Sequence, residues 1–202
     1  MTTRSLAVPT AFLTLTLALT GCGGDSGSPA PEAGEGATAS PAAAGHNDAD
    51  VAFARLVIPH HAQAVRMSGL ILDTPGVGER TRKLAQDIAA AQQPEIDRMT
   101  GWLRDWDAQV PATDVTGEAV DHSGHGSGML SEEDLRALDE ATGERAERLF
   151  LEQMIRHHEG AIAMARDEVR TGAHPGAVEL ARTIAGSQEA EVAVMRSLLA
   201  GR

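Results

Sequence analysis

The sequence predicts an all-α protein, a four-helix bundle made of two repeated helical hairpins. A segment that begins at Phe53 returns 97 positions later at Phe150, and a second segment that begins at Leu84 returns 96 positions later at Leu180. Both segments carry apolar residues at the helical period. Strand signals are lacking, since aromatic residues make up 2% of the chain and there is no Tyr. Two hairpins that each expose one apolar stripe can bury it by packing together.

The first repeat carries a His doublet in both copies. It reads F-A-R-L-V-I-P-H-H-A-Q-A-V-R-M in one copy and F-L-E-Q-M-I-R-H-H-E-G-A-I-A-M in the other. On a 3.6-residue helix, His60 and His157 fall on the apolar stripe of their copies, and His61 and His158 lie about 100° round the helix. We therefore expect one imidazole of each copy to point inward and the other to flank the buried face.

The N-terminus resembles an export signal. Residues 1–21 combine one positive charge with a short apolar run and end in Leu19-Thr20-Gly21, followed by Cys22. This resembles a bacterial lipoprotein cleavage box, which predicts a mature chain lipid-modified at Cys22, facing outside the cytoplasm and anchored to the cell membrane. An ordinary secretory signal with an incidental cysteine is the alternative. Cys22 is the only cysteine, so no disulfide or thiolate site is expected.

The rest of the chain divides into a tether and one folded domain. Residues 22–46 are rich in Gly, Ser, Ala and Pro, a composition typical of a flexible tether. Residues 47–202 form the predicted bundle, with hairpin one at 47–109, a His-containing linker at 110–130 and hairpin two at 131–202. Its helices are predicted at about 48–72, 78–108, a short run from Ser131, a long run to about 171, and a last run to about 199.

Two prolines and the net charge add further expectations. Pro59 and Pro94 lie inside predicted helices, and a kink at Pro59 could splay the first doublet. The formal net charge of −12 argues against nucleic-acid binding, because few cations are present to neutralise phosphates.

The inner polar residues allow two interpretations. Glu95 and Glu191 stand on apolar stripes, where an unpaired carboxylate would cost several kcal/mol. In the structural interpretation, His60 and His157 form hydrogen bonds with these glutamates and fix the register of the hairpins. In the functional interpretation, the convergent N and O groups hold a metal ion.

Methionines and a His-rich loop favour a soft ion. Repeat-paired methionines occupy inward positions, where methionine is usually core filler, but thioethers beside imidazoles favour copper, especially Cu(I). His122 and His125 lie among glycines in the linker and could form an auxiliary site, or simply belong to a polar linker. His46 could contribute from the tether, and His174 is expected to be a surface residue. The repeat-paired methionines are Met67, Met99, Met164 and Met195.

Enzymatic interpretations have less support. A di-iron carboxylate centre needs Glu-x-x-His pairs, and neither doublet has Glu three residues before it. No nucleophile motif and no phosphate-binding glycine loop is present. A metal-dependent redox enzyme stays open as an alternative, as does a structural or partner-binding lipoprotein without metal.

The paired I-x-H-H-x-x-A-x-x-M motifs, joined by a D-H-S-G-H linker, resemble the bacterial secreted family known as domain-of-unknown-function family 305. The resemblance covers about residues 46–200. It implies a ferritin-like four-helix bundle exported from the cell, and it suggests metal handling, with copper the ion associated with some members. Val57, where the family often has Met, and Pro94 depart from its pattern. By position, the family's motif residues are His60, His61, Met67, His157, His158 and Met164.

Together these observations predict an extracytoplasmic lipoprotein that binds a transition metal, with copper favoured, for sequestration or delivery. The inner histidines and glutamates would form or brace the primary site, and the outer histidines and methionines would supply soft or entry ligands. The full set of predicted metal residues is His60, His61, Met67, Glu95, Met99, His157, His158, Met164, Glu191, Met195, His122 and His125.

Overall fold

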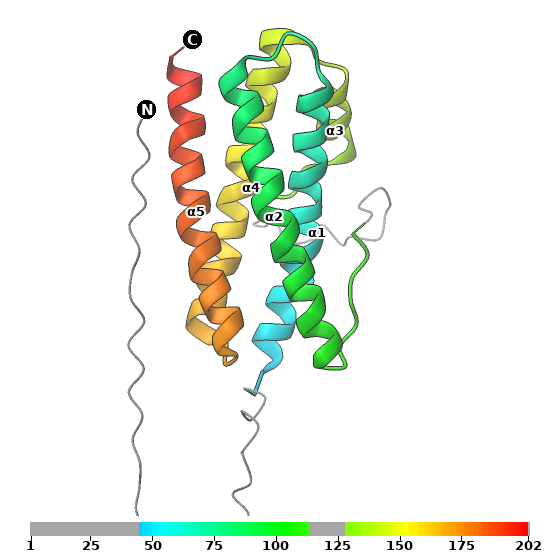
Figure 1. The fold of residues 1–202 in the computed structure, drawn as a ribbon, viewed down its shortest axis with the longest axis vertical. Coiled ribbons are helices and arrows are strands. Elements are labelled where there is room, and N and C mark those ends of the chain that lie inside the picture. The colour runs from blue at the N-terminus through cyan, green and yellow to red at the C-terminus, as the bar shows by residue number, and fades with distance from the viewer. Residues whose placement is uncertain (1–44, 114–127, 202) are drawn as a thin grey trace, which may run out of the picture. The chain divides into compact units, whose positions relative to one another are not determined.

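The computed structural model describes residues 45–113 and 128–201, and these form a bundle of long antiparallel helices (Figure 1). The chain runs through α1 (Asp48–Asp73), α2 (Glu79–Asp105), α3 (Glu132–Asp139), α4 (Gly143–Thr171) and α5 (Pro175–Ala200). The predicted all-α class and paired hairpins are confirmed, and the ends of the long helices agree with the predicted ends within about three residues. None of the described helices combines the length and apolarity needed to cross a membrane.

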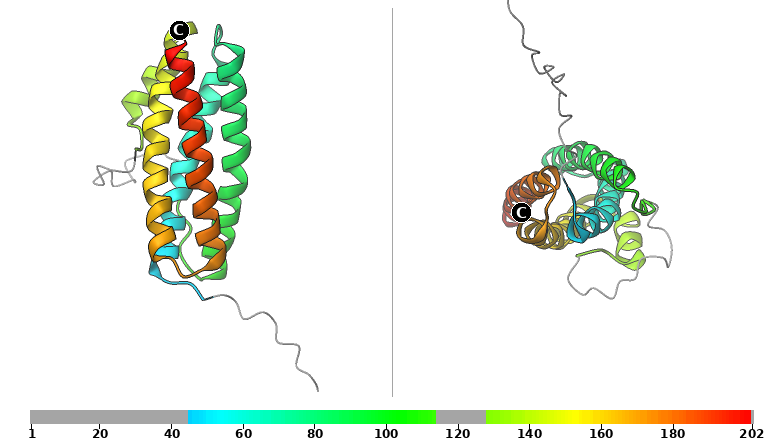
Figure 2. Two further views of the ribbon diagram at one scale, coloured as in Figure 1. Left: turned by 90° about the vertical axis from the view of Figure 1, so that its left-hand side faces the viewer. Right: turned by 90° about the horizontal axis from the view of Figure 1, so that it is seen from below.

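The two hairpins are α1–α2 and α4–α5. The contacts within these two helix pairs are more extensive than those between any other pair of helices in the fold. The hairpins meet mainly along α1 and α4, whereas α2 and α5 touch much less. Seen along the bundle axis, the four long helices form a ring, with the short α3 packed outside it against α1 and α4 (Figure 2). The seam between α1 and α4 is therefore the principal contact between the two repeats.

Local sequence sets where the first hairpin begins and turns. Asn47 caps α1, because its side chain accepts from the backbone N–H of Ala49 and Asp50 while Asp50 accepts from the Asn47 N–H. Gly76, with a φ of 79°, lies in the turn after α1, a conformation that glycine adopts without strain.

The apolar core is divided in two along the bundle axis. One cluster joins the second half of α1 and the first half of α4, and includes Met67, Phe150 and Met154. The other joins the first half of α1 and the second half of α4, and includes Phe53 and Ala165. The His doublets lie between these two clusters, so a polar layer crosses the middle of the bundle. The polar layer, as used below, comprises His60, His61, Gln92, Glu95, His157, His158, Gln188 and Glu191.

Candidate metal centre

One histidine from each repeat meets its counterpart at the centre of the bundle. The ring centroids of His60 and His157 lie 3.7 Å apart at an interplanar angle of 35°. Both residues are buried, with exposed fractions of 1% and 0%. The prediction that imidazoles from opposite halves converge on one enclosed place is therefore confirmed.

The second histidine of each doublet pairs with a glutamate of its own hairpin. His61 Nε2 lies 2.8 Å from Glu95 Oε2, and His158 Nε2 lies 2.7 Å from Glu191 Oε2. The structural interpretation had the inner histidines bonded to these glutamates, whereas the structure pairs the glutamates with the second histidine of each doublet. It also buries His61 and His158 completely, where flanking positions were expected.

These pairs determine which ring nitrogen is available. An ionised carboxylate can only accept, so Nε2 of each imidazole carries the proton that is donated to the glutamate. In the neutral ring the lone pair is then on Nδ1. Nδ1 of both His61 and His158 is buried and has no hydrogen-bond partner among the described residues. Histidines that bind a metal through one ring nitrogen usually donate a hydrogen bond from the other, often to a carboxylate.

The two doublets have nearly the same geometry. The ring centroids lie 6.4 Å apart at 54° in His60 and His61, and 6.3 Å apart at 51° in His157 and His158. Only α1 carries a proline, Pro59, beside its doublet. The expectation that this proline splays the first doublet is wrong, because the doublet without a proline has nearly the same geometry.

The electrostatics of the layer keep His157 neutral. Complete burial lowers the pKa of His157 well below its usual value of 6.5, and the neighbouring charges of His60, His158 and His61 lower it further. The backbone of His60 has a smaller opposing effect. Metal binding requires a neutral imidazole, so His157 has the required protonation state at neutral pH.

Other buried polar atoms of the layer also have no partner within the described part of the chain. These include Oε1 and Nε2 of Gln92 and Oε1 of Gln188. An unpaired buried polar atom costs about 1–3 kcal/mol, so a set of them in one layer is unusual for a purely structural core. Within residues 45–113 and 128–201, however, no three His, Cys, Asp or Glu side chains already form a metal-binding group. An ion here would require the side chains to turn.

The methionines do not form a single group with the imidazoles. Met67 and Met195 belong to one apolar cluster, whereas Met99 belongs to the other. Met164 is partly buried and packs against that second cluster. The methionines therefore lie on both sides of the polar layer, and their role as ligands stays a prediction.

Several predicted residues lie elsewhere. Cys22, His122 and His125 fall outside the described residues. His46 stacks on Trp106 with centroids 4.6 Å apart, at the end of the bundle. His174 is partly buried there, where its Nδ1 accepts from the Ala177 N–H and caps α5. This cap gives His174 a structural position instead of the simple surface position that was expected.

Comparison with known proteins places this arrangement in a family. The family model described as "Domain of unknown function (DUF305)" matches residues 50–199. The chain belongs to the DUF305 family. Among curated proteins, none matches the chain significantly.

Solved structures of DUF305 proteins have the same fold. A protein of Streptomyces coelicolor, described as secreted, is 33% identical, with 76% of this chain and 91% of that chain covered and a TM-score of 0.67. A DUF305 fragment from Deinococcus radiodurans is 31% identical, with 77% and 98% covered and a TM-score of 0.68. CopM in its Cu(II)-bound form is 31% identical, with 74% and 94% covered and a TM-score of 0.63. CopM has also been solved with Cu(I) and with silver.

The structure shows two buried features that sequence reasoning did not find. Gln63 binds the backbone of Leu130 on the far side of the linker. Asp50 and Glu168, from α1 and α4, form a carboxyl pair at the end of the bundle. Gln63 lies three residues after His60, one helical turn along the same face, and this spacing was a signal for its inward position.

Proposed function

We propose that this DUF305 protein binds copper in the polar layer, for sequestration or delivery outside the cytoplasm. The observation that carries the proposal is the pair of histidines, His61 and His158, whose Nε2 atoms lie beside carboxylates and whose buried Nδ1 atoms have no hydrogen-bond partner in the described part of the chain. Between them are the facing rings of His60 and His157. This places up to four imidazole ligands within one enclosed layer.

The chemistry of the donors fits copper. Imidazole suits Cu, Zn, Fe and Ni, and thioethers select Cu(I). Buried methionines stand on either side of the layer, in a chain that has a single cysteine, Cys22. CopM, whose solved forms contain Cu(I), Cu(II) and silver, supports the same ion class. Glu95 and Glu191 would orient the second histidine of each doublet and raise its basicity as a ligand.

A titration with a Cu(I) chelator as competitor tests this function. Replacing His61 and His158 together by Ala should weaken Cu(I) affinity by about 100-fold or more, since two ligands are lost. The matched control is His174→Asn, which alters a histidine far from the layer while Asn keeps a side-chain acceptor for the α5 cap. Wild-type affinity in the double variant, with its helical circular dichroism intact, would refute copper binding in the layer.

A purely structural role for the layer is the second candidate, and the two His-Glu pairs favour it. Each pair joins the two helices of one hairpin and could fix their register without any metal. If the layer has only this structural role, the purified protein should contain no copper, and added Cu(I) should not raise its thermal stability. Copper binding predicts the opposite, because an ion present at 1,000 times its dissociation constant stabilises the folded state by about 4 kcal/mol.

Export and anchoring belong to the same proposal. We propose that residues 1–21 direct secretion and that Cys22 carries the lipid that holds the protein at the membrane. The similarity to a family member described as secreted supports export. Replacing Cys22 by Ser should move the protein from the membrane fraction to the soluble fraction of cells. Retention of the variant in membranes would contradict the anchor.

A further inference from the structure

The segment from Gly128 to Ser131, called the strap here, lies against the backbone of the second His doublet. Gly128 has a φ of 71°, and a Cβ on it would lie 2.3 Å from the carbonyl oxygen of Arg156 and 3.1 Å from Cα of His157. Only glycine allows so close an approach in this conformation. The strap therefore touches α4 at the level of the facing imidazoles.

The same strap is bound to α1 two residues later. The Leu130 N–H donates to Gln63 Oε1 at 2.8 Å, and Gln63 Nε2 donates to the Leu130 carbonyl at 3.0 Å. Both groups are buried, with exposed fractions of 2% for Gln63 and 4% for Leu130. Gln63 lies about one turn after His60, on the same face of α1. The strap thus extends from the backbone of His157 to a residue beside His60.

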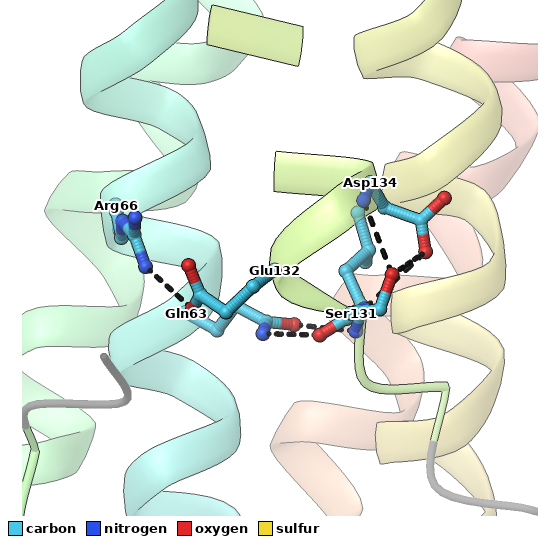
Figure 3. A network of polar contacts seen from close by, with 6 residues as sticks. Gln63, Arg66, Ser131, Glu132 and Asp134 are labelled. Carbon is cyan, nitrogen blue, oxygen red and sulfur yellow. Dashed lines mark hydrogen bonds and ion pairs between the residues drawn. The ribbon is translucent and has the colours of Figure 1, made fainter. Parts of the chain in front are cut away.

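The far end of the strap is fixed by α3. Ser131 caps this helix, since its Oγ accepts from the Asp134 N–H and the Asp134 carboxylate accepts from the Ser131 N–H. Figure 3 shows α3 between α1 and α4, with Gln63 reaching toward Ser131 from α1. The ion pair of Arg66 with Glu132 is half exposed and adds little. The buried hydrogen bonds to Gln63 are the main connection to α1.

Two of the other seams at this level are occupied by different groups. His61 and Glu95 occupy the seam between α1 and α2, and His158 and Glu191 occupy the seam between α4 and α5. The seam between α1 and α4 holds the facing rings of His60 and His157. It is the seam that the strap crosses.

We propose that the strap closes the α1–α4 seam over the two facing imidazoles and sets the rate at which an ion enters and leaves the polar layer. The ion-exchange part rests on the proposed copper binding. Opening requires both hydrogen bonds between Gln63 and Leu130 to break, which exposes two backbone groups that water can then satisfy. The strap acts as a cover whose contacts include the hydrogen bonds of one glutamine side chain, the burial of Leu130 in an apolar cluster and close packing at one glycine.

Chemical labelling of histidines tests the cover without any metal. Metal-free protein is treated with diethylpyrocarbonate, and the modification rate of each histidine is measured by peptide mass spectrometry. Gln63→Leu keeps the size of the side chain but leaves the Leu130 N–H and carbonyl unpaired while the strap is closed. We expect His60 and His157 to react at least about ten-fold faster in this variant, equal to about 1.4 kcal/mol of easier opening. Gly128→Ala should have the same effect by pushing the strap off Arg156.

The matched control is Gln153→Leu. Gln153 is equally buried and donates from its side chain to a backbone carbonyl, that of Asp134 in α3, so its loss has a similar cost while both hydrogen bonds between Gln63 and Leu130 remain. Unchanged labelling in this control supports the cover. Equal acceleration in all three variants, or no acceleration in Gln63→Leu and Gly128→Ala, would overturn it.

A second measurement separates this proposal from the proposed function. Cu(I)-loaded protein is mixed with excess chelator, and release should be at least about ten-fold faster in Gln63→Leu than in wild type, with a smaller change in affinity than in rate. If wild type binds no Cu(I), the proposed function fails and the labelling result alone decides whether the strap is a cover. If Cu(I) binds but release is unchanged in Gln63→Leu, the strap does not control exchange.

Discussion

Replacing Glu168 by Gln should stabilise the protein, because Glu168 is a buried acid that stays protonated. Its exposed fraction is 2%, and it lies against Asp50, whose exposed fraction is 0%. The Asp50 carboxylate accepts from the N–H groups of Asn47, Ala173 and His174. Burial, together with the neighbouring Asp50 carboxylate, raises the pKa of Glu168 to about 8 from its ordinary value of 4.5.

The size of the effect follows from these two values. In the unfolded chain at pH 7, Glu168 is ionised, whereas the folded protein must keep its proton. Keeping it costs about 1.4 kcal/mol for each pH unit between 4.5 and 7, or about 3 kcal/mol in total. Gln carries no such cost, and its amide group, like a protonated acid, can offer a donor to the Asp50 carboxylate. The variant should therefore be more stable at pH 7 by up to about 3 kcal/mol.

The pH dependence gives a sharper test than the value at one pH. A raised folded-state pKa means that the contribution of Glu168 is fully present below pH 4.5 and is lost as the pH rises to about 8. The stability difference between the variant and wild type should therefore grow from pH 5 to pH 8. Titration of His157 affects both proteins alike and cancels in the difference.

Urea unfolding followed by circular dichroism at several pH values measures this difference. Glu152→Gln, an exposed position on the same helix, is the control and should change stability little at any pH. A Glu168→Gln variant that is less stable than wild type at pH 7, or a difference that does not vary with pH, would refute the buried protonated acid.

Three further predictions concern neighbouring contacts. Gly172→Ala should lower stability by about 1–3 kcal/mol in thermal unfolding, because a Cβ would lie 2.3 Å from Oε1 of Glu168; an unchanged melting temperature would contradict that packing. Asn47→Ala should cost about 1 kcal/mol through loss of the α1 cap, measured by urea unfolding, and a neutral result would show that the cap is dispensable. Replacing Glu95 and Glu191 together by Gln should weaken Cu(I) affinity about ten-fold or more in competition titrations, whereas equal affinity would show that these carboxylates do not orient ligands.

Much of the fold could be predicted because its causes are local or repeated. Helix ends follow from capping residues such as Asn47 and Ser131 and from breakers such as Pro75, all of which act on their own neighbours. The inward position of His60 and His157 follows from helical periodicity. The duplication indicated that these two imidazoles would come from equivalent places in two halves, and the structure confirms it.

The partners of the glutamates could not be predicted from the sequence. Neighbouring helix positions differ by about 100°, so a small rotation or shift between antiparallel helices decides whether Glu95 meets His60 or His61. Neither the rotation nor the shift of the two helices can be read from the sequence to that precision. The contacts of Asp50 with Glu168 and of Gln63 with Leu130 join residues far apart in the chain, and they depend on how the hairpins pack.

We propose that copper binds in the polar layer of this DUF305 protein. The most direct test is a crystal structure of the Cu(I)-loaded protein, with copper located by its anomalous scattering. Copper binding in the layer predicts a peak there, bound by at least two of the doublet imidazoles, with the ring nitrogens about 2 Å from the metal. Copper found only outside the layer, with His60 and His157 still in ring contact, would contradict it.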